Sequence, residues 1–245
     1  MRLDPSFGTL SRSGALAALA VGAAVTSGTG WWGAAALLTF FIGSTGVSRA
    51  CPDPAAERGE AKGGRRDAGQ VLANGGAPAL GALLGLAEPT VGLWVLSIGL
   101  AAAAADTWAT ALGATSSTAP RHLLTGRPVP AGTSGGITLR GTGASMLGAA
   151  SIGAVGWLAT RDVRLLVACI VVGTGGMLVD SLLGATLQGR FHCPACDVST
   201  ERPRHRCGTL ARPVGGVRWL SNDGVNAIST LLATGTGWWI VASMS

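Results

Sequence analysis

Two carboxylates interrupt long apolar stretches of this sequence. Asp106 lies in ADTWATALG (residues 105–113), and Asp180 lies in GGMLVDSLLGATLQG (residues 175–189). In a helix, the residues that share a face with each carboxylate are mostly glycine, alanine or threonine. Small faces pack against other helices, so both carboxylates should face protein or water rather than lipid. Ionisable groups in such places are usually functional, and we interpret both as members of a site between helices.

Two further acids, Asp67 and Asp223, stand at the ends of apolar segments. Clustered carboxylates repel one another unless a cation lies among them, and a set of oxygen ligands suits Mg²⁺. We therefore predict that Asp106 and Asp180 bind Mg²⁺. Asp106, Asp180 and Asp67 are the predicted catalytic residues.

The glycine-rich stretch AGTSGGITLRGTG (residues 131–143) precedes another apolar segment. Consecutive backbone N–H groups in such a turn can bind an anion, although ordinary flexible loops are rich in glycine too. Because predicted Mg²⁺-binding carboxylates lie at the same membrane face, we favour the anion site over a flexible loop. The predicted nucleotide- and phosphate-binding residues are Arg65, Arg66, Asn74, Gly132, Thr133, Ser134, Gly135, Gly136, Arg140, Asn222, Asp223 and Asn226.

A third pattern is CPACDVSTERPRHRCG, in which C-x2-C is followed by H-x-C. Cys193, Cys196, His205 and Cys207 have the ligand types of a small structural zinc knuckle in the loop 188–222. The alternative is a mobile loop with free thiols, and the spacing alone leaves both open.

The composition indicates which elements position these residues. Of the 245 residues, 48% are hydrophobic, 12% are charged and 39 are glycine, whereas soluble domains are about one quarter charged. We predict an all-α, polytopic integral membrane protein that forms a single domain over residues 1–245. Seven segments, or six if one of the weaker ones is discounted, have the roughly 17–25 residues that cross a bilayer. These are 13–30, 31–48, 70–87, 90–113, 141–160, 163–187 and 224–243.

The distribution of charge predicts the orientation. A cytoplasmic N-terminus places 16 of the 18 lysine and arginine residues on the cytoplasmic side, with only Arg161 and Arg164 outside, as the positive-inside rule requires. Basic residues spread over short loops in this way do not indicate nucleic acid as a partner. All the polar motifs then meet at the cytoplasmic face, where we expect the site. The tryptophans expected at the outer interface are Trp31, Trp32, Trp94, Trp157, Trp238 and Trp239.

Six motifs carry a family resemblance. LSRSGALAALAVG, GRRDAGQVLANGG, ADTWATALG, GTSGGITLRGT, DSLLGATLQG and NDGVN follow one another from about Leu10 to Asn226. Together they resemble the integral membrane family that includes plant phytyl-phosphate kinase and the animal transmembrane protein 19. The resemblance implies nucleotide-dependent phosphorylation of a prenyl monophosphate to the diphosphate, with CTP or a related nucleotide. Most members of that family are prokaryotic, so we expect a prokaryotic plasma membrane.

Chemistry and resemblance agree on the class of reaction. Carboxylates that hold Mg²⁺ beside an anion site at a membrane boundary suit phosphoryl transfer to a lipid. The expected partners are a nucleoside triphosphate, a prenyl phosphate lipid and the bilayer, and a homo-oligomer is compatible with the sequence. One alternative is a CTP-dependent cytidylyltransferase acting on a lipid phosphate. The other is a cation-coupled transporter, which should carry inverted repeats and polar groups near the membrane midplane.

Overall fold

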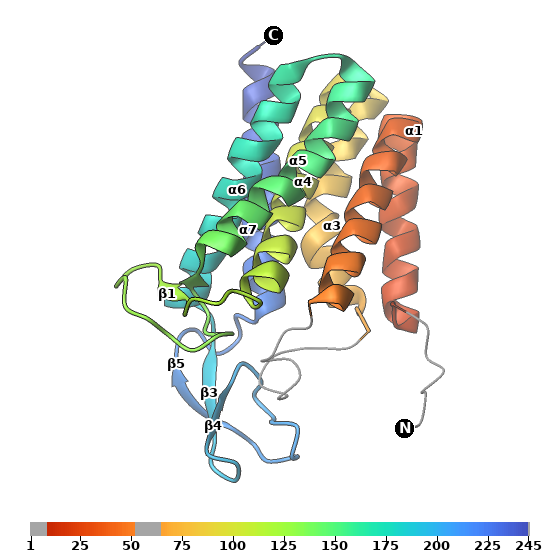
Figure 1. Ribbon diagram of the computed structural model, residues 1–245. Coiled ribbons are helices and arrows are strands. Elements are labelled where there is room, and N and C mark those ends of the chain that lie inside the picture. The colour runs from red at the N-terminus through yellow and green to blue at the C-terminus, as the bar shows by residue number, and fades with distance from the viewer. Residues whose placement is uncertain (1–8, 52–64, 245) are drawn as a thin grey trace.

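A bundle of long helices makes up most of the molecule (Figure 1). The computed structural model describes residues 9–51 and 65–244. The helices are α1 (Arg12–Ala50), α3 (Ala68–Ala82), the short 3₁₀ helix η1 (Leu83–Leu86), α4 (Pro89–Gly113), α5 (Leu139–Thr160), α6 (Val163–Thr186) and α7 (Asn222–Ala242). Arg2 and most of the basic loop at 49–69, on which the predicted orientation partly rests, lie outside the described residues.

Helix α1 consists of two arms. Gly30 has φ 61° and ψ −147°, a conformation that glycine adopts without a steric penalty. The arms on either side of Gly30 run in opposite directions, so that both ends of α1 lie at the lower end of the bundle in Figure 1. The predicted spans 13–30 and 31–48 coincide with these two arms.

The structure supports a membrane protein, and each predicted span coincides with a helix or with one arm of α1. By length and composition, four of the described helices can cross a membrane: α1, α4, α5 and α6. Helix α3 is 15 residues long and α7, though longer, is less apolar. The full number of spans and the cytoplasmic N-terminus stay predictions.

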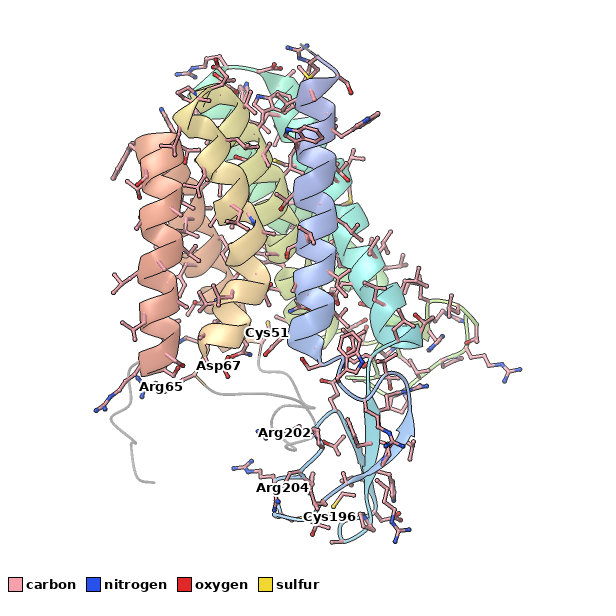
Figure 2. All side chains as sticks on the ribbon, turned by 180° about the vertical axis from the view of Figure 1, so that it is seen from behind. Cys51, Arg65, Asp67, Cys196, Arg202 and Arg204 are labelled. Carbon is pink, nitrogen blue, oxygen red and sulfur yellow. The ribbon has the colours of Figure 1, made fainter. Side chains whose placement is uncertain are left out.

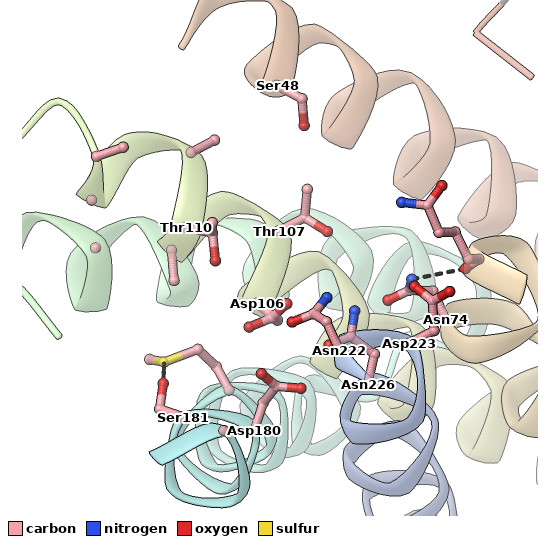
Figure 3. Close-up of a pocket in the computed structure, with 18 of the residues that line it drawn as sticks. Ser48, Asn74, Asp106, Thr107, Thr110, Asp180, Ser181, Asn222, Asp223 and Asn226 are labelled. Atoms are coloured by element: carbon pink, nitrogen blue, oxygen red, sulfur yellow. Dashed lines mark hydrogen bonds between the residues drawn. The ribbon is translucent and has the colours of Figure 1, made fainter. Parts of the chain in front are cut away.

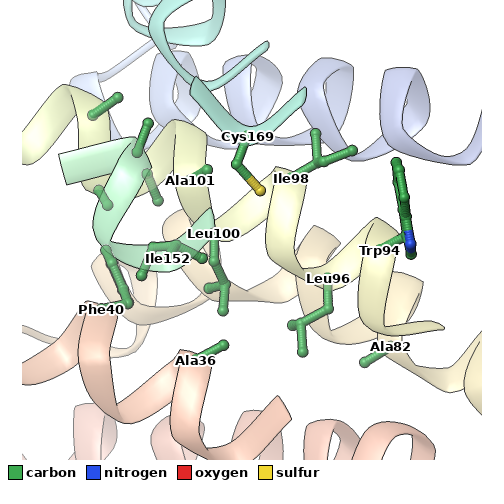
Figure 4. Packing of buried hydrophobic residues seen from close by; sticks show 14 of the residues in the cluster. Ala36, Phe40, Ala82, Trp94, Leu96, Ile98, Leu100, Ala101, Ile152 and Cys169 are labelled. Atoms are coloured by element: carbon green, nitrogen blue, oxygen red, sulfur yellow. The ribbon is translucent and has the colours of Figure 1, made fainter. Parts of the chain in front are cut away.

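Helix α4 is the centre of the bundle and packs against α1, α3, α5, α6 and α7. Its side chains Leu96, Ile98 and Leu100 are fully buried, as is the alanine run 101–105 (Figure 4). Trp94, predicted at the outer interface, is only 4% exposed and belongs to this core. The other five tryptophans predicted at the outer interface, namely Trp31, Trp32, Trp157, Trp238 and Trp239, are exposed.

Small residues bring α6 close to α4. A Cβ atom at Gly173 would lie 3.0 Å from the backbone carbon of Ala101, and one at Gly176 would lie 2.7 Å from the Cβ of Ala102. Only glycine permits this approach, and the close contact is the kind that stabilises helix pairs where lipid removes the hydrophobic effect. The small face of α6 therefore points into the bundle.

The prediction of an all-α fold is incomplete, because two small antiparallel sheets lie at the lower end (Figure 1). Strand β1 (Arg121–His122) pairs with β2 (Gly136–Ile137). Strands β3 (Arg190–Cys193), β4 (Val198–Thr200) and β5 (Arg212–Gly215) form a sheet in the order β4-β3-β5. We call residues 188–220 the ribbon. These strands have two to four residues, too few to show the alternation of polar and apolar residues that predicts a strand.

A candidate site at the ribbon end of the bundle

A cavity of about 630 Å³ lies at the end of the bundle that carries the ribbon. Both arms of α1, the helices α3 to α7, the loop 131–138 and the ribbon contribute residues to its lining. Figure 3 shows that its polar side chains come from segments far apart in the sequence and point towards a common space. The polar segments that were expected to share one face of the membrane therefore meet at one end of the molecule.

Asp106 and Asp180 face each other in this cavity (Figure 3). Each lies one helical turn beyond a close contact of the two helices, because Ala102 precedes Asp106 by four residues and Gly176 precedes Asp180 by four. The carboxyl groups are near enough to interact directly. Asp180 is 9% exposed and Asp106 is half-buried, so the small faces around them hold two poorly hydrated acids together.

The first turns of α7 add polar groups to the same space. Asn222, Asp223 and Asn226 line the cavity, and Ser229, one further turn along, donates a hydrogen bond of 3.2 Å to Oδ1 of Asp180. Among the described residues, Oδ1 of Asn226 is buried without a hydrogen-bond partner. Leaving such a group unpaired costs about 1–3 kcal/mol, so this atom calls for a ligand or water in the cavity.

The donor atoms in this part of the cavity fit a hard cation. The carboxylates of Asp106 and Asp180 and the amide oxygen of Asn226 are all oxygen ligands, the kind that Mg²⁺ prefers. Two carboxyl groups held this close need either a shared proton or a cation between them. The residues present are therefore suitable for Mg²⁺.

The three predicted arginines have different positions. The side chain of Arg66 lines the cavity, and burial lowers the pKa of its guanidinium, which still carries its charge. The Arg65 Nε donates to the carbonyl oxygen of Leu10 (2.9 Å), and its side chain is exposed at the lower edge of the bundle (Figure 2). Arg140 is also exposed and donates to the carbonyl oxygen of Thr115 (3.1 Å). Arg66 is the one of the three that can meet an anion inside the cavity.

The glycine-rich loop forms an ordered wall of the cavity. Gly135 has φ 79° and packs so closely on Ala185 of α6 that a Cβ atom would overlap the side chain. The hydroxyl of Thr133 donates to the carbonyl oxygen of Pro130 (2.7 Å), and that of Ser134 donates to Glu201 (3.0 Å). Both hydroxyls are thus engaged with protein, and an anion at this loop would meet backbone groups first. Gly132 and Gly136 line the cavity as well.

Asp67 has a structural position. It is the N-cap of α3, where its carboxylate accepts a hydrogen bond from the backbone N–H of Gln70 (3.1 Å). In return, the backbone N–H of Asp67 donates to the side-chain oxygen of Gln70 (3.2 Å). Its carboxylate and that of Asp223 both lie next to Gly69. Asp67 is not among the residues that line the cavity, whereas Asn74, two turns into the same helix, is.

Three residues that line the cavity or contact its carboxylates escaped the sequence analysis. Ser229 could have been found, because it lies three residues after Asn226 on the same face of a helix. Gln188 is 2% exposed and its Nε2 has no hydrogen-bond partner among the described residues. Glu201 comes from the ribbon and lies close enough to Asp180 to act on it electrostatically. No helical pattern points to Glu201, since its position depends on how the ribbon folds.

The lining is apolar on one side. Val21, Leu37, Phe40 and Phe41 of α1 line the cavity, and Figure 3 shows α1, at Ser48, on the side opposite Asp180. The cavity can therefore accommodate an alkyl chain along α1 and a charged group against α4, α6 and α7.

The four predicted metal ligands converge outside this cavity, in the ribbon. The ligand atoms of Cys193, Cys196, His205 and Cys207 all lie within 4.8 Å of one another. Hydrogen bonds to Thr209 and then to His205 lower the pKa of the Cys207 thiol to about 5. A hydrogen bond to Cys207 raises the pKa of Cys196 to about 11. The cluster thus favours one thiolate, the form that binds metals.

Comparison with known proteins identifies the family of this chain. The profile of the family described as "Integral membrane protein DUF92" matches residues 4–234. "Protein PGR" of Arabidopsis thaliana is 30% identical over 141 residues, which cover 53% of this chain and 48% of the relative. An uncharacterized membrane protein of Methanocaldococcus jannaschii is 39% identical over 118 residues, 48% of this chain and 50% of that protein. The chain spans about half the length of these curated relatives. No solved structure matches it.

Proposed function

Because this chain belongs to the DUF92 family of integral membrane proteins, we propose that it is a membrane-bound kinase that phosphorylates a prenyl monophosphate. The phosphoryl donor is a nucleoside triphosphate, with CTP as the first candidate. The proposal combines the resemblance to the family that includes phytyl-phosphate kinase with the carboxylate pair of the cavity.

The observation that carries the proposal is the division of the cavity into two halves. Asp106, Asp180 and Asn226 form a polar half, and the apolar residues of α1 form the other. A prenyl phosphate has the same division, with an alkyl chain and a phosphate head. In this arrangement the chain lies along α1 while its phosphate reaches the polar half.

The reaction needs positioning more than acid–base catalysis. An oxygen of the prenyl phosphate attacks the γ-phosphorus of the nucleotide, the bond from that phosphorus to the β,γ-bridging oxygen breaks, and the nucleoside diphosphate leaves. A phosphate monoester with a second pKa of about 6 is already a dianion at neutral pH, so no proton has to be removed from it. The chain's task is to align the two substrates and to stabilise the charge.

Asp106 and Asp180 are the residues that would hold Mg²⁺, whose charge would neutralise the phosphate oxygens during transfer. Ser229 orients Asp180 through its hydrogen bond. Arg66 would bind a phosphate group from the side of α3, since it lines the cavity and its guanidinium carries a permanent positive charge.

Radiolabelled nucleotide tests the proposal and separates it from the rival enzyme. Purified protein in lipid nanodiscs is incubated with Mg²⁺, a panel of prenyl monophosphates, and CTP labelled at either the α- or the γ-phosphorus. The kinase transfers the γ-label to lipid and releases CDP. Transfer of the α-label with release of diphosphate would instead identify a cytidylyltransferase. No labelled lipid with CTP, ATP, GTP or UTP would overturn the proposed function and leave cation-coupled transport to be tested.

A further inference from the structure

The ribbon holds two tight turns that each present two metal-binding side chains. In the first, Cys193 ends β3 and its carbonyl oxygen accepts from the backbone N–H of Asp197 (2.9 Å), which brings Cys196 back beside it. In the second, the N–H of Gly208 donates to the carbonyl oxygen of His205 (2.9 Å), which places Cys207 at the top of the turn. Gly208 has φ 90°, which favours glycine at this position.

The distances between the ligand atoms fit one metal ion. Sγ of Cys193 lies 3.6 Å from Sγ of Cys207, and Nδ1 of His205 lies 3.2 Å from the same Sγ. Two thiolates bound to one Zn²⁺ at about 2.3 Å in a tetrahedron lie about 3.8 Å apart. A disulfide would require about 2.05 Å, and all three cysteines are free.

We propose that Cys193, Cys196, His205 and Cys207 bind one Zn²⁺ as a closed structural site. Three sulfurs and one imidazole nitrogen form the soft ligand set that selects zinc over the hard cations suited to carboxylates. Four protein ligands complete a tetrahedron and leave no position for substrate, so the zinc stabilises structure.

The ribbon has reason to need such a site. Among its described residues, the large apolar side chains that are buried are Phe191 and Leu220, while Leu210, Val214 and Trp219 are exposed. A segment of this size cannot bury enough apolar surface to fold on its own, and structural metals commonly supply the missing stability.

The zinc site is connected to the cavity through β4. Cys196 lies at the end of the ribbon away from the helices (Figure 2), and β4 leads from there to Glu201. The carboxylate of Glu201 accepts a hydrogen bond from Ser134 (3.0 Å) and lines the cavity. Zinc thus fixes the strand that holds Glu201, a positioning residue, against the glycine-rich loop.

Metal analysis tests the site without reference to activity. Full-length protein, purified in detergent without chelators, should contain about one zinc per chain. Cys193→Ser and Cys207→Ser should each lose it, whereas Cys169→Ser, in α6, should retain it as the matched control. Protein with less than about 0.1 zinc per chain that takes up none from added Zn²⁺ would overturn the proposal, and so would iron at full occupancy.

Removing zinc from the parent protein with a chelator provides a second test, which does not require the variants to fold. Arg204 lies between the two turns and Arg206 lies within the second, and both are trypsin sites, whereas Arg202 precedes Pro203 and is not cleaved. Removing zinc should expose Arg204 and Arg206 to limited trypsin digestion while the helical circular dichroism is kept, and added Zn²⁺ should restore protection. Equal cleavage with and without zinc would contradict a structural site. Both readouts are independent of nucleotide and prenyl phosphate, so the zinc site and the kinase proposal can fail separately.

Discussion

Gly176 of α6 lies against Ala102 of α4, one helical turn before the point where Asp180 faces Asp106. A Cβ atom at Gly176 would lie 2.7 Å from the Cβ of Ala102, closer than two such atoms approach in proteins. The absence of a side chain at Gly176 therefore allows α6 to lie close to α4 beside the carboxylates. This relation makes the geometry of the site sensitive to a single methyl group.

We expect Gly176→Ala to lower both the melting temperature and the activity of the purified protein, because the added methyl group forces α6 away from α4 and moves Asp180 with it. Gly175→Ala is the control, since a Cβ atom there meets nothing within 4 Å. The control should keep the parent's melting temperature and turnover. Equal effects of the two substitutions would show that the close contact does not position the site.

Asp106→Asn and Asp180→Asn should each lower turnover at least about a hundredfold, which corresponds to about 2.7 kcal/mol of lost transition-state stabilisation. The amide keeps the size of the side chain but removes the charge that would hold Mg²⁺ in the proposed site. The melting temperature should be kept or raised, because neutralising a buried acid beside another relieves repulsion. Asp162→Asn, at the opposite end of α6, is the control with normal turnover. An Asp180→Asn protein with a lowered melting temperature but normal turnover would contradict the role of Asp180 in binding Mg²⁺.

Substitutions of Asp67 can distinguish a catalytic role from a helix-capping role. As an N-cap it should be replaceable by asparagine, which caps helices as well as aspartate does, whereas alanine should cost about 1 kcal/mol of stability. We therefore expect Asp67→Asn to keep both turnover and melting temperature and Asp67→Ala to lower the melting temperature. Turnover that collapses in Asp67→Asn at an unchanged melting temperature would return Asp67 to the catalytic residues.

The orientation in the membrane can be measured in intact cells. With the ribbon end in the cytoplasm, a cysteine introduced as Glu88→Cys should react with a membrane-impermeant maleimide from outside. One introduced as Arg127→Cys should react only after permeabilisation. The parent protein shows how much its own cysteines react under both conditions. The reverse pattern would place the cavity on the external side, away from cytosolic nucleotide.

The helices and the carboxylate pair could be predicted because their signals are repeated along the chain. Long apolar stretches mark each helix, and small residues at positions four before Asp106 and Asp180 show which face is buried. The capping role of Asp67 was also available, because Gln70 three residues later completes a capping box. The position of that acid between polar motifs favoured the catalytic interpretation instead.

The ribbon and its contribution to the cavity could not be predicted in the same way. Strand β5 pairs with β3 across about 20 residues, as His192 does with Arg212, and the local sequence carries little sign of that pairing. Strands β3 and β4 form a local hairpin, but both are too short to show a strand pattern. The position of Glu201 follows from the fold of the ribbon as a whole. The spacing of the cysteines and the histidine still predicted that they would come together, because a metal-ligand motif is recognised from residue types and spacing and not from hydrophobic periodicity.

The location of the cavity limits which membrane lipids can reach it. Asp106, Asp180 and Asn226 lie towards the ribbon end of the bundle, while short connections join the helices at the other end. A lipid in the leaflet on the ribbon side can bring its phosphate to these residues without leaving that leaflet. A lipid in the opposite leaflet would first have to move its charged head group across the bilayer. In the proposed reaction, the lipid diphosphate would accumulate in the leaflet where it formed, and its use in the other leaflet would require a separate flippase.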